Sequence, residues 1–100
     1  MIRHIVMFKI KDEESEDIKK ENLMHLKKMI DDLKITVPQI HKLETGINFS
    51  TRPVAYDLVL ISEFHTPEDL ETYLSHDEHQ KMAEYLGTIR QSVAMVDYYF

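Results

Sequence analysis

The hydrophobic pattern of this chain alternates between two periods, and the order of these periods restricts the fold more than any other feature. Apolar residues alternate with other residues over 2–11, 56–65 and 92–100, which is typical of β-strands. A less regular stretch over 40–49 also indicates a strand, in which Gly46 marks a bulge or a close approach of another chain segment. The sequence therefore predicts four strands, and the segments between them decide how they connect.

The first of these segments predicts a long amphipathic helix. From Ile18 to Leu33, apolar residues recur at helical spacing opposite a lysine-rich face, and Ser15 is a possible N-terminal cap. Pro38 lacks a backbone donor and disfavours the helical conformation of the residue before it. We therefore expect this helix to stop by about Lys34.

A second helical region follows the third strand, and it is expected in two parts. Thr66 followed by Pro67 is typical of a helix start, so a short helix is predicted to about Leu74. The segment Ser75–Glu78 fits a capping box, in which Ser75 caps a helix that begins anew. Gly87 is expected to close that second part.

This order, β-α-β-β-α-β, predicts an α+β ferredoxin-like fold with a four-stranded antiparallel sheet, and one hundred residues suffice for a single domain over 1–100. Two helices cover one face of such a sheet. The other face would carry more apolar side chains than a monomer normally exposes to water. We expect a second copy of the sheet to cover it. The apolar residues predicted on this face are Ile5, Met7, Val59, Ile61, Ala94, Val96, Tyr98 and Phe100.

Composition excludes several classes of function. Twelve Lys and Arg against eighteen Asp and Glu give a net charge of −6, which repels nucleic acid. The chain has no cysteine, which excludes disulfides, thiolate zinc sites and iron–sulfur clusters, and a cytoplasmic location fits best. We find neither a signal peptide nor a membrane span, so no membrane partner is expected. Only two glycines occur, so no glycine-rich nucleotide loop is possible.

Three of the six histidines lie near other polar candidates, and two of these share a short segment. Tyr73, His76 and His79 are spaced so that a helical path would place them on one stripe. A phenol and an imidazole together can polarise a carbonyl and move a proton near neutral pH. The alternative is structural: His76 lies at an exposed helix start, while Tyr73 and His79 close an edge of the core.

His4 and Asp97 are predicted to point toward the helices. A lone histidine among apolar neighbours is usually a core residue with a satisfied hydrogen bond, whereas a carboxylate at such a position needs a partner. Either His79 or His4 would serve Asp97, and the pair would be structural or catalytic. The remaining histidines look solvated, and since no HExxH-type pair occurs, no metal site and no cofactor are predicted. The solvated positions are His25, His41 and His65.

Taken together, these segments resemble the stress-responsive A/B barrel (Dabb) domain family, a branch of the dimeric α/β-barrel proteins. The resemblance spans essentially the whole chain, although Asp77 stands where the family commonly has proline after the first histidine. The matching segments are Arg3–Lys11, Val37–Ile40 with Gly46, Tyr56–Leu60 with Phe64, Tyr73 with His76 and His79, and Val96–Tyr98.

The resemblance implies a homodimer in which two ferredoxin-like sheets pack face to face into a barrel. It also implies site residues, because a plant polyketide cyclase of this family closes a ring with a Tyr acid and a His base that match Tyr73 and His79. His4 and Asp97 match a further pocket histidine and a pocket carboxylate, whereas another pocket histidine falls on Leu58. Haem degradation in a neighbouring branch requires a tryptophan, which this chain lacks.

The sequence therefore leads to two hypotheses about function. In the first, the protein is a Dabb-family homodimer with a small apolar pocket between helices and sheet, lined by the four site residues, and acts in binding or stress protection. In the second, it is a cofactor-independent enzyme on a small carbonyl or aromatic compound, through polyketide-cyclase-like aldol chemistry or as a monooxygenase. There His79 is the general base, Tyr73 the acid or oxyanion donor, Asp97 orients an imidazole and His4 polarises the substrate.

Overall fold

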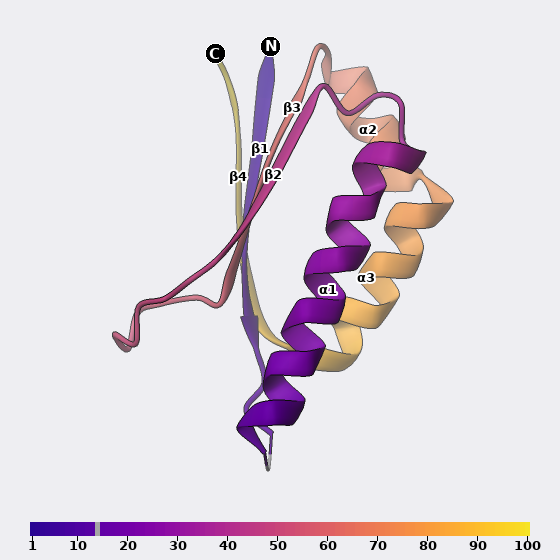
Figure 1. Ribbon diagram of the computed structural model, residues 1–100. Helices are drawn as coiled ribbons and strands as arrows, with labels where there is room; N and C mark the ends of the chain where they lie inside the picture. The colour runs from indigo at the N-terminus through magenta and orange to yellow at the C-terminus, as the bar shows by residue number, and fades with distance from the viewer. Residues whose placement is uncertain (14) are drawn as a thin grey trace.

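The computed structural model describes residues 1–13 and 15–100, and in this part of the chain four strands and three helices follow the predicted order. Figure 1 shows them as one sheet with all the helices on the same side. The elements are β1 (Ile2–Ile10), α1 (Glu16–Thr36), β2 (Lys42–Ile47), β3 (Leu58–Phe64), α2 (Pro67–Ser75), α3 (Asp77–Ile89) and β4 (Arg90–Tyr99).

The strands form one antiparallel sheet in the order β2-β3-β1-β4. This arrangement confirms the predicted ferredoxin-like fold. β1 lies in the interior of the sheet and pairs with both β3 and β4, so that His4 lies opposite Ser62 on one side and Asp97 on the other. Because side chains alternate across a strand, this register fixes which residues of β1 meet the helices.

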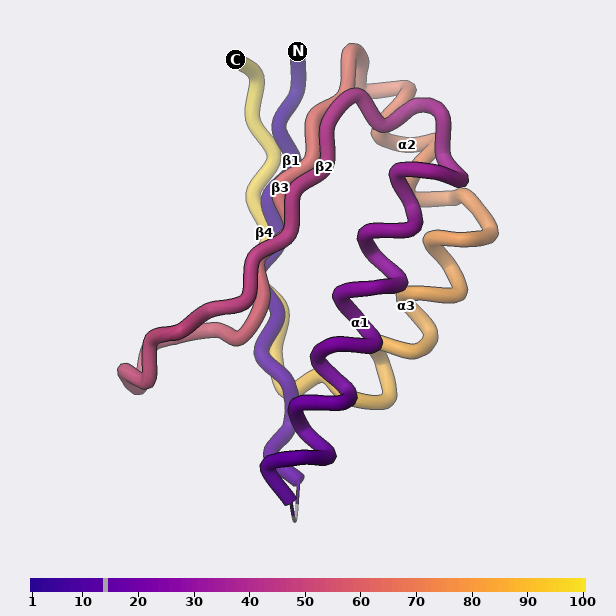
Figure 2. The backbone as a smooth tube through the Cα atoms, viewed as in Figure 1, coloured from indigo at the N-terminus to yellow at the C-terminus, as the bar shows by residue number. Residues whose placement is uncertain are grey.

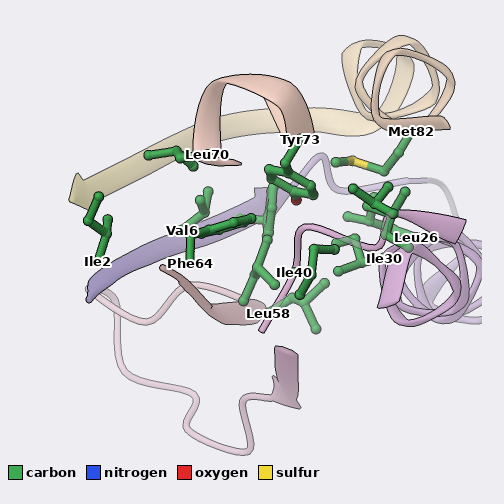
Figure 3. Packing of buried hydrophobic residues seen from close by; sticks show 14 of the residues in the cluster. Ile2, Val6, Leu26, Ile30, Ile40, Leu58, Phe64, Leu70, Tyr73 and Met82 are labelled. Carbon is green, nitrogen blue, oxygen red and sulfur yellow. The ribbon is translucent and has the colours of Figure 1, made fainter. Parts of the chain in front are cut away.

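The core fills the space between the sheet and the helices (Figure 3). Alternate residues of β1 and β3 are buried there, and α1 contributes three buried residues one helical turn apart. Burial of each such side chain stabilises the fold by roughly 1.5 to 3 kcal/mol. The buried apolar residues of the two strands and α1 are Ile2, Val6, Phe8, Ile10, Leu58, Leu60, Phe64, Leu26, Ile30 and Leu33.

α1 ends two residues later than predicted. Ser15 caps its N-terminus as expected, since its hydroxyl accepts a hydrogen bond from the backbone N–H of Asp17 at 3.1 Å. At the other end, Thr36 is still helical, and Val37 is the extended residue that Pro38 requires. The predicted stop at Lys34 was too early because proline restricts only the residue directly before it.

No helix of the described residues is both long and apolar enough to cross a membrane.

The second helical region is divided as predicted, but a different residue caps its second part. Thr66 caps α2 through a 3.1 Å bond from the N–H of Asp69. At the start of α3 the cap is His76, whose Nδ1 accepts from the N–H of Glu78 at 3.1 Å. Ser75 still belongs to α2, and its hydroxyl donates to the carbonyl of Glu71 at 2.9 Å. The capping box predicted for Ser75 is therefore wrong by one residue.

Gly87 does not close α3, and Gly46 does not form the bulge that was one of its two predicted roles. α3 continues through Gly87 to Ile89 and passes directly into β4 at Arg90, so no left-handed glycine cap is needed between them. Gly46 lies opposite Val59 in regular register, so it forms no bulge. The irregularity in the sheet occurs instead between β1 and β4, at Lys9 and Ile10.

The face of the sheet opposite the helices is only partly buried in a single chain. We call this the open face, and its apolar members are those predicted from the sequence. Met7, Val96 and Phe100 expose 41%, 52% and 51% of their surface. Arg3 crosses this face: it donates to Glu63 at 3.2 Å and to the Tyr98 hydroxyl at 2.9 Å. Its guanidinium also lies 3.9 Å from the centre of the Phe100 ring.

The core can be tested at Phe64, which is fully buried. We expect Phe64→Ala to lower the free energy of unfolding by about 3 to 5 kcal/mol, because it removes buried apolar surface and leaves a cavity. The matched control is Ile35→Ala, since Ile35 is 83% exposed on α1 and should change stability by less than about 0.5 kcal/mol. Urea unfolding followed by circular dichroism measures both. Equal effects of the two substitutions would contradict this account of the core.

Candidate functional site

The predicted carboxylate–imidazole contact forms between His4 and Asp97. The two residues lie side by side on β1 and β4, on the face toward the helices. His4 is 3% exposed, and its Nδ1 contacts a carboxylate oxygen of Asp97, whose side chain is 33% exposed. A ring N–H that donates to a carboxylate satisfies the hydrogen bond of that buried imidazole nitrogen. Of the two partners predicted for Asp97, the structure selects His4.

Tyr73 belongs to the core rather than to the wall of a cleft. It projects from α2 into the apolar cluster and is fully buried (Figure 3). Its ring centre lies 5.2 Å from that of Phe64 and 6.1 Å from that of His4. Burial raises the pKa of the Tyr73 phenol far above its ordinary value, so the hydroxyl stays protonated at neutral pH. Among the described residues, this hydroxyl has no hydrogen-bond partner.

His79 packs against Tyr73 from the first turn of α3. The two ring centres are 4.7 Å apart, with the rings edge to face. Burial lowers the pKa of His79, and the nearby His4 lowers it further, so the imidazole is neutral at pH 7. Its Nδ1 is buried and, like the Tyr73 hydroxyl, finds no partner in the described part of the chain.

His76 does not join this cluster. The spacing of Tyr73, His76 and His79 assumed a continuous helix, but the chain is extended at His76, with φ −65° and ψ 141°. This break brings the rings of Tyr73 and His79 together, while the His76 ring turns to cap α3 through Glu78. The sequence predicted the break but not its effect on the direction of the His76 side chain.

The four site residues meet as a packed cluster, and Asp97 also borders a surface hollow. This hollow has a volume of about 150 Å³ and lies between α2 and the end of β4. His4 contacts Asp97, and its ring centre lies 6.1 Å from that of Tyr73. The apolar pocket predicted between all four residues therefore stays a prediction. The residues that line the hollow are Ile2, Pro67, Leu70, Asp97, Tyr98 and Tyr99.

β4 extends beyond the cover of the helices, which the sequence did not indicate. Met95 lies on the same face of β4 as Asp97, toward the helices, but 61% of its surface is exposed. Tyr99 on the same face is 76% exposed. Because α2 and α3 cover only part of this edge strand, Asp97 remains accessible from solvent.

A second pair of histidines was missed. His41 and His65 were predicted only as solvated positions, and both are exposed. Their ring centres lie 4.6 Å apart, at the adjoining ends of β2 and β3. The register of these two strands was the only signal from which this pairing could have been found.

No group of three or more His, Cys, Asp or Glu side chains that could hold a metal ion occurs in the described residues.

The sheet order and the His4–Tyr73–His79–Asp97 cluster define a small α+β protein of the ferredoxin-like class. Comparison with known proteins is more specific. The family model described as the Stress responsive A/B Barrel Domain (Dabb) matches residues 2–100, and the chain belongs to this family. An uncharacterised protein of Streptomyces coelicolor is 34% identical over 85 residues, which cover 80% of each chain.

Solved structures with the same fold include both uncharacterised proteins and an enzyme. A protein of unknown function from Bacteroides fragilis, described as dimeric with a ferredoxin-like fold, is 31% identical; the match covers 99% of this chain and 95% of that one, with a TM-score of 0.89. The hydroxynitrile lyase of Passiflora edulis is 16% identical over 99% of this chain and 92% of its own, with a TM-score of 0.83. The second likeness shows the common fold alone.

The lowered pKa of His79 predicts a pH dependence of stability. An unfolded histidine has a pKa of about 6.5, whereas in the folded chain protonation of His79 is opposed by burial. Below about pH 6.5, His79 therefore binds a proton in the unfolded state but stays neutral in the folded state. The free energy of unfolding falls as the pH is lowered toward the pKa of His79 in the folded state. We expect His79→Leu to be less sensitive to pH than the wild type between pH 7 and 5, as measured by urea unfolding. His25→Gln, on the surface of α1, is the control, and an equal reduction of the pH dependence in this control would contradict the assignment to His79.

Proposed function

We propose that the protein forms a homodimer through its open face and binds a small, uncharged, largely apolar molecule at the cluster of His4, Tyr73, His79 and Asp97. Three buried side-chain polar atoms lack hydrogen-bond partners among the described residues: Gln39 Oε1, Tyr73 Oη and His79 Nδ1. The observation that carries the binding proposal is that two of them, those of Tyr73 and His79, belong to rings in contact with each other. An unsatisfied buried polar group costs about 1 to 3 kcal/mol. In native proteins such groups are usually satisfied by water or a ligand.

The neighbouring residues indicate what kind of molecule would fit. Tyr73 offers a neutral hydroxyl donor, and His79 is a neutral imidazole at pH 7, so neither supplies a charge that would favour an ion. Phe64 and Leu70 surround them with apolar surface. A ligand with one carbonyl or hydroxyl group on an apolar body would satisfy these donors and acceptors.

The hollow beside Asp97 supports an entry route. It lies between α2 and β4 and is lined by Asp97, the partner of His4. α2 is only nine residues long and buries just Leu70 and Tyr73. A small outward shift of α2 would therefore extend the hollow to the cluster while disturbing few core contacts.

Acetophenone, a neutral aromatic ketone, is a suitable probe for this site. We expect it to shift the amide resonances around His4, Tyr73 and His79 in NMR titrations. Tyr73→Phe keeps the ring but removes the hydroxyl, and the loss of one hydrogen bond of about 1 kcal/mol should weaken binding roughly five-fold. Without ligand, the same variant should be as stable as the wild type or more stable, because it removes an unpaired buried hydroxyl.

Tyr56→Phe is the control, because Tyr56 lines a hollow at the opposite end of β3 and should leave acetophenone binding unchanged. A titration to millimolar acetophenone without shifts around the cluster would contradict the proposed binding site. Equal affinity of the wild type and Tyr73→Phe would remove Tyr73 from it.

The homodimer is supported by the open face. Its apolar residues form a continuous surface over β1, β3 and β4, and single exposed chains rarely keep such a surface. The Bacteroides fragilis relative, which matches 99% of this chain, is described as dimeric. Two open faces packed together would bury these residues in both copies.

Sedimentation at micromolar concentration tests the dimer directly. We expect twice the chain mass of 11.9 kDa for the wild type and a monomer for Val96→Glu, which places a charge on the open face beside Ile5. Met24→Glu is the control, because Met24 is 50% exposed on α1 and lies on the helix side. A monomeric wild type would overturn the homodimer.

The contact between Tyr73 and His79, whose ring centres are 4.7 Å apart, makes catalysis a second candidate function of the same cluster. A phenol that stays protonated and an imidazole that stays neutral can act as acid and base on one carbonyl compound. The simplest test is exchange of the methyl protons of acetophenone with deuterium in D₂O, followed by NMR. Exchange above the buffer rate that is lost in both Tyr73→Phe and His79→Ala would support catalysis. Binding without such exchange would leave the binding role alone.

A further inference from the structure

We propose that residues 48–57, here called the arm, clasp the second copy in the dimer. This inference rests on the homodimer proposed above and adds to it a specific contact element. The arm connects β2 to β3 and leaves the sheet on the side away from the helices, as both views of the backbone show (Figures 1 and 2). It therefore extends into the space that a second copy would occupy.

Hydrogen bonds hold the arm in a defined shape. Asn48 is central to them: its backbone N–H donates to the carbonyl of Asp57 at 2.9 Å, and its side-chain amide donates to the carbonyl of Tyr56 at 2.7 Å. The same side chain accepts from the N–H of Ser50 at 2.8 Å. At the base, Asp57 donates its N–H to Phe8 at 2.8 Å and accepts from the N–H of Ile10 at 2.7 Å. The arm is thus anchored to the interior strand β1.

The apolar side chains of this well-braced segment point into solvent. Phe49 is 98% exposed and Val54 is 84% exposed. Loops that only connect strands usually display polar residues, whereas a backbone fixed by hydrogen bonds that displays Phe and Val is typical of a contact surface. The cost of ordering these side chains is recovered if they are buried in an interface.

An apolar hollow of about 260 Å³ lies at the foot of the arm. Gly46 contributes no side chain to it, and the neighbouring open-face residues Met7 and Val59 form its floor together with Phe49 and Tyr56 of the arm. The hollow is therefore continuous with the open face. An apolar side chain of the second copy would fill it while the arm packs along that copy's flank.

The geometry of stacked sheets favours a second copy as the occupant. Two sheets that pack face to face are about 10 Å apart. An arm that leaves one sheet on its open side passes the edge of the other sheet rather than ending in front of it. A two-fold dimer repeats every contact, so each copy would supply one arm and receive one.

Truncation of the arm tests the proposal. We expect Phe49→Ser to raise the dimer dissociation constant about ten-fold or more, because two buried aromatic contacts are lost per dimer. Ile35→Ser is the matched control, because Ile35 is 83% exposed on the helix side and should leave dimerisation unchanged. Gly46→Leu, which fills the hollow from within the same chain, is expected to weaken the dimer in the same direction as Phe49→Ser.

A photocrosslinker locates the contact itself. With p-benzoylphenylalanine in place of Phe49, and a mixture of ¹⁴N- and ¹⁵N-labelled chains, we expect adducts that join one light and one heavy chain. The arm contact would be overturned if the wild type is a dimer and both Phe49→Ser and Gly46→Leu dimerise as tightly as the wild type. Adducts formed only within one chain would overturn it as well. Either result would leave the homodimer itself unaffected. A monomeric wild type would overturn both.

Discussion

The interior strand β1 and its register with two neighbours determine most of this structure. Each residue of β1 faces either the helices or the open side, and a slip of one residue would place Arg3 in the core and His4 outside it. The register also sets His4 opposite Asp97. One pattern of alternation therefore builds the core, places the only imidazole–carboxylate contact seen in the described residues, and leaves an apolar surface on the far side.

Features that depend on a repeating sequence pattern could be predicted, whereas features that depend on one particular side-chain contact could not. The strands, their order and the pairing of Asp97 with an imidazole could be inferred, because two-residue periodicity survives in any tertiary context. The ends of elements could not: whether Ser75 or His76 caps α3 depends on one ring reaching Glu78, and Gly87 needed no special conformation once α3 ran directly into β4. The depth of Tyr73 was also hidden, because spacing shows that residues share a face but not how much covers them.

Tyr73 and His79 place polar atoms where apolar ones would pack equally well. A phenylalanine and a leucine would satisfy the core, and the chain instead keeps two polar atoms without partners among the described residues. Local conflicts of this kind tend to occur where function imposes its own requirement on a fold. The unpaired polar atoms lower the stability of α2 and of the beginning of α3, which carry these residues and meet at a break in the helix. α2 buries two side chains, Leu70 and Tyr73, and the first turn of α3 buries none.

β4 presents a different surface on each side. Asp97 faces the histidine cluster, while its neighbours Val96 and Tyr98 face the open side. A rigid strand cannot shift one set of side chains without shifting the other. Thermodynamic linkage then has a strict consequence for a molecule that binds at the cluster. If the dimer binds it more tightly than the monomer by some factor per site, the bound molecule must strengthen dimerisation by the same factor per site. In the proposed dimer, β4 would therefore couple the binding of a molecule at the cluster to self-association.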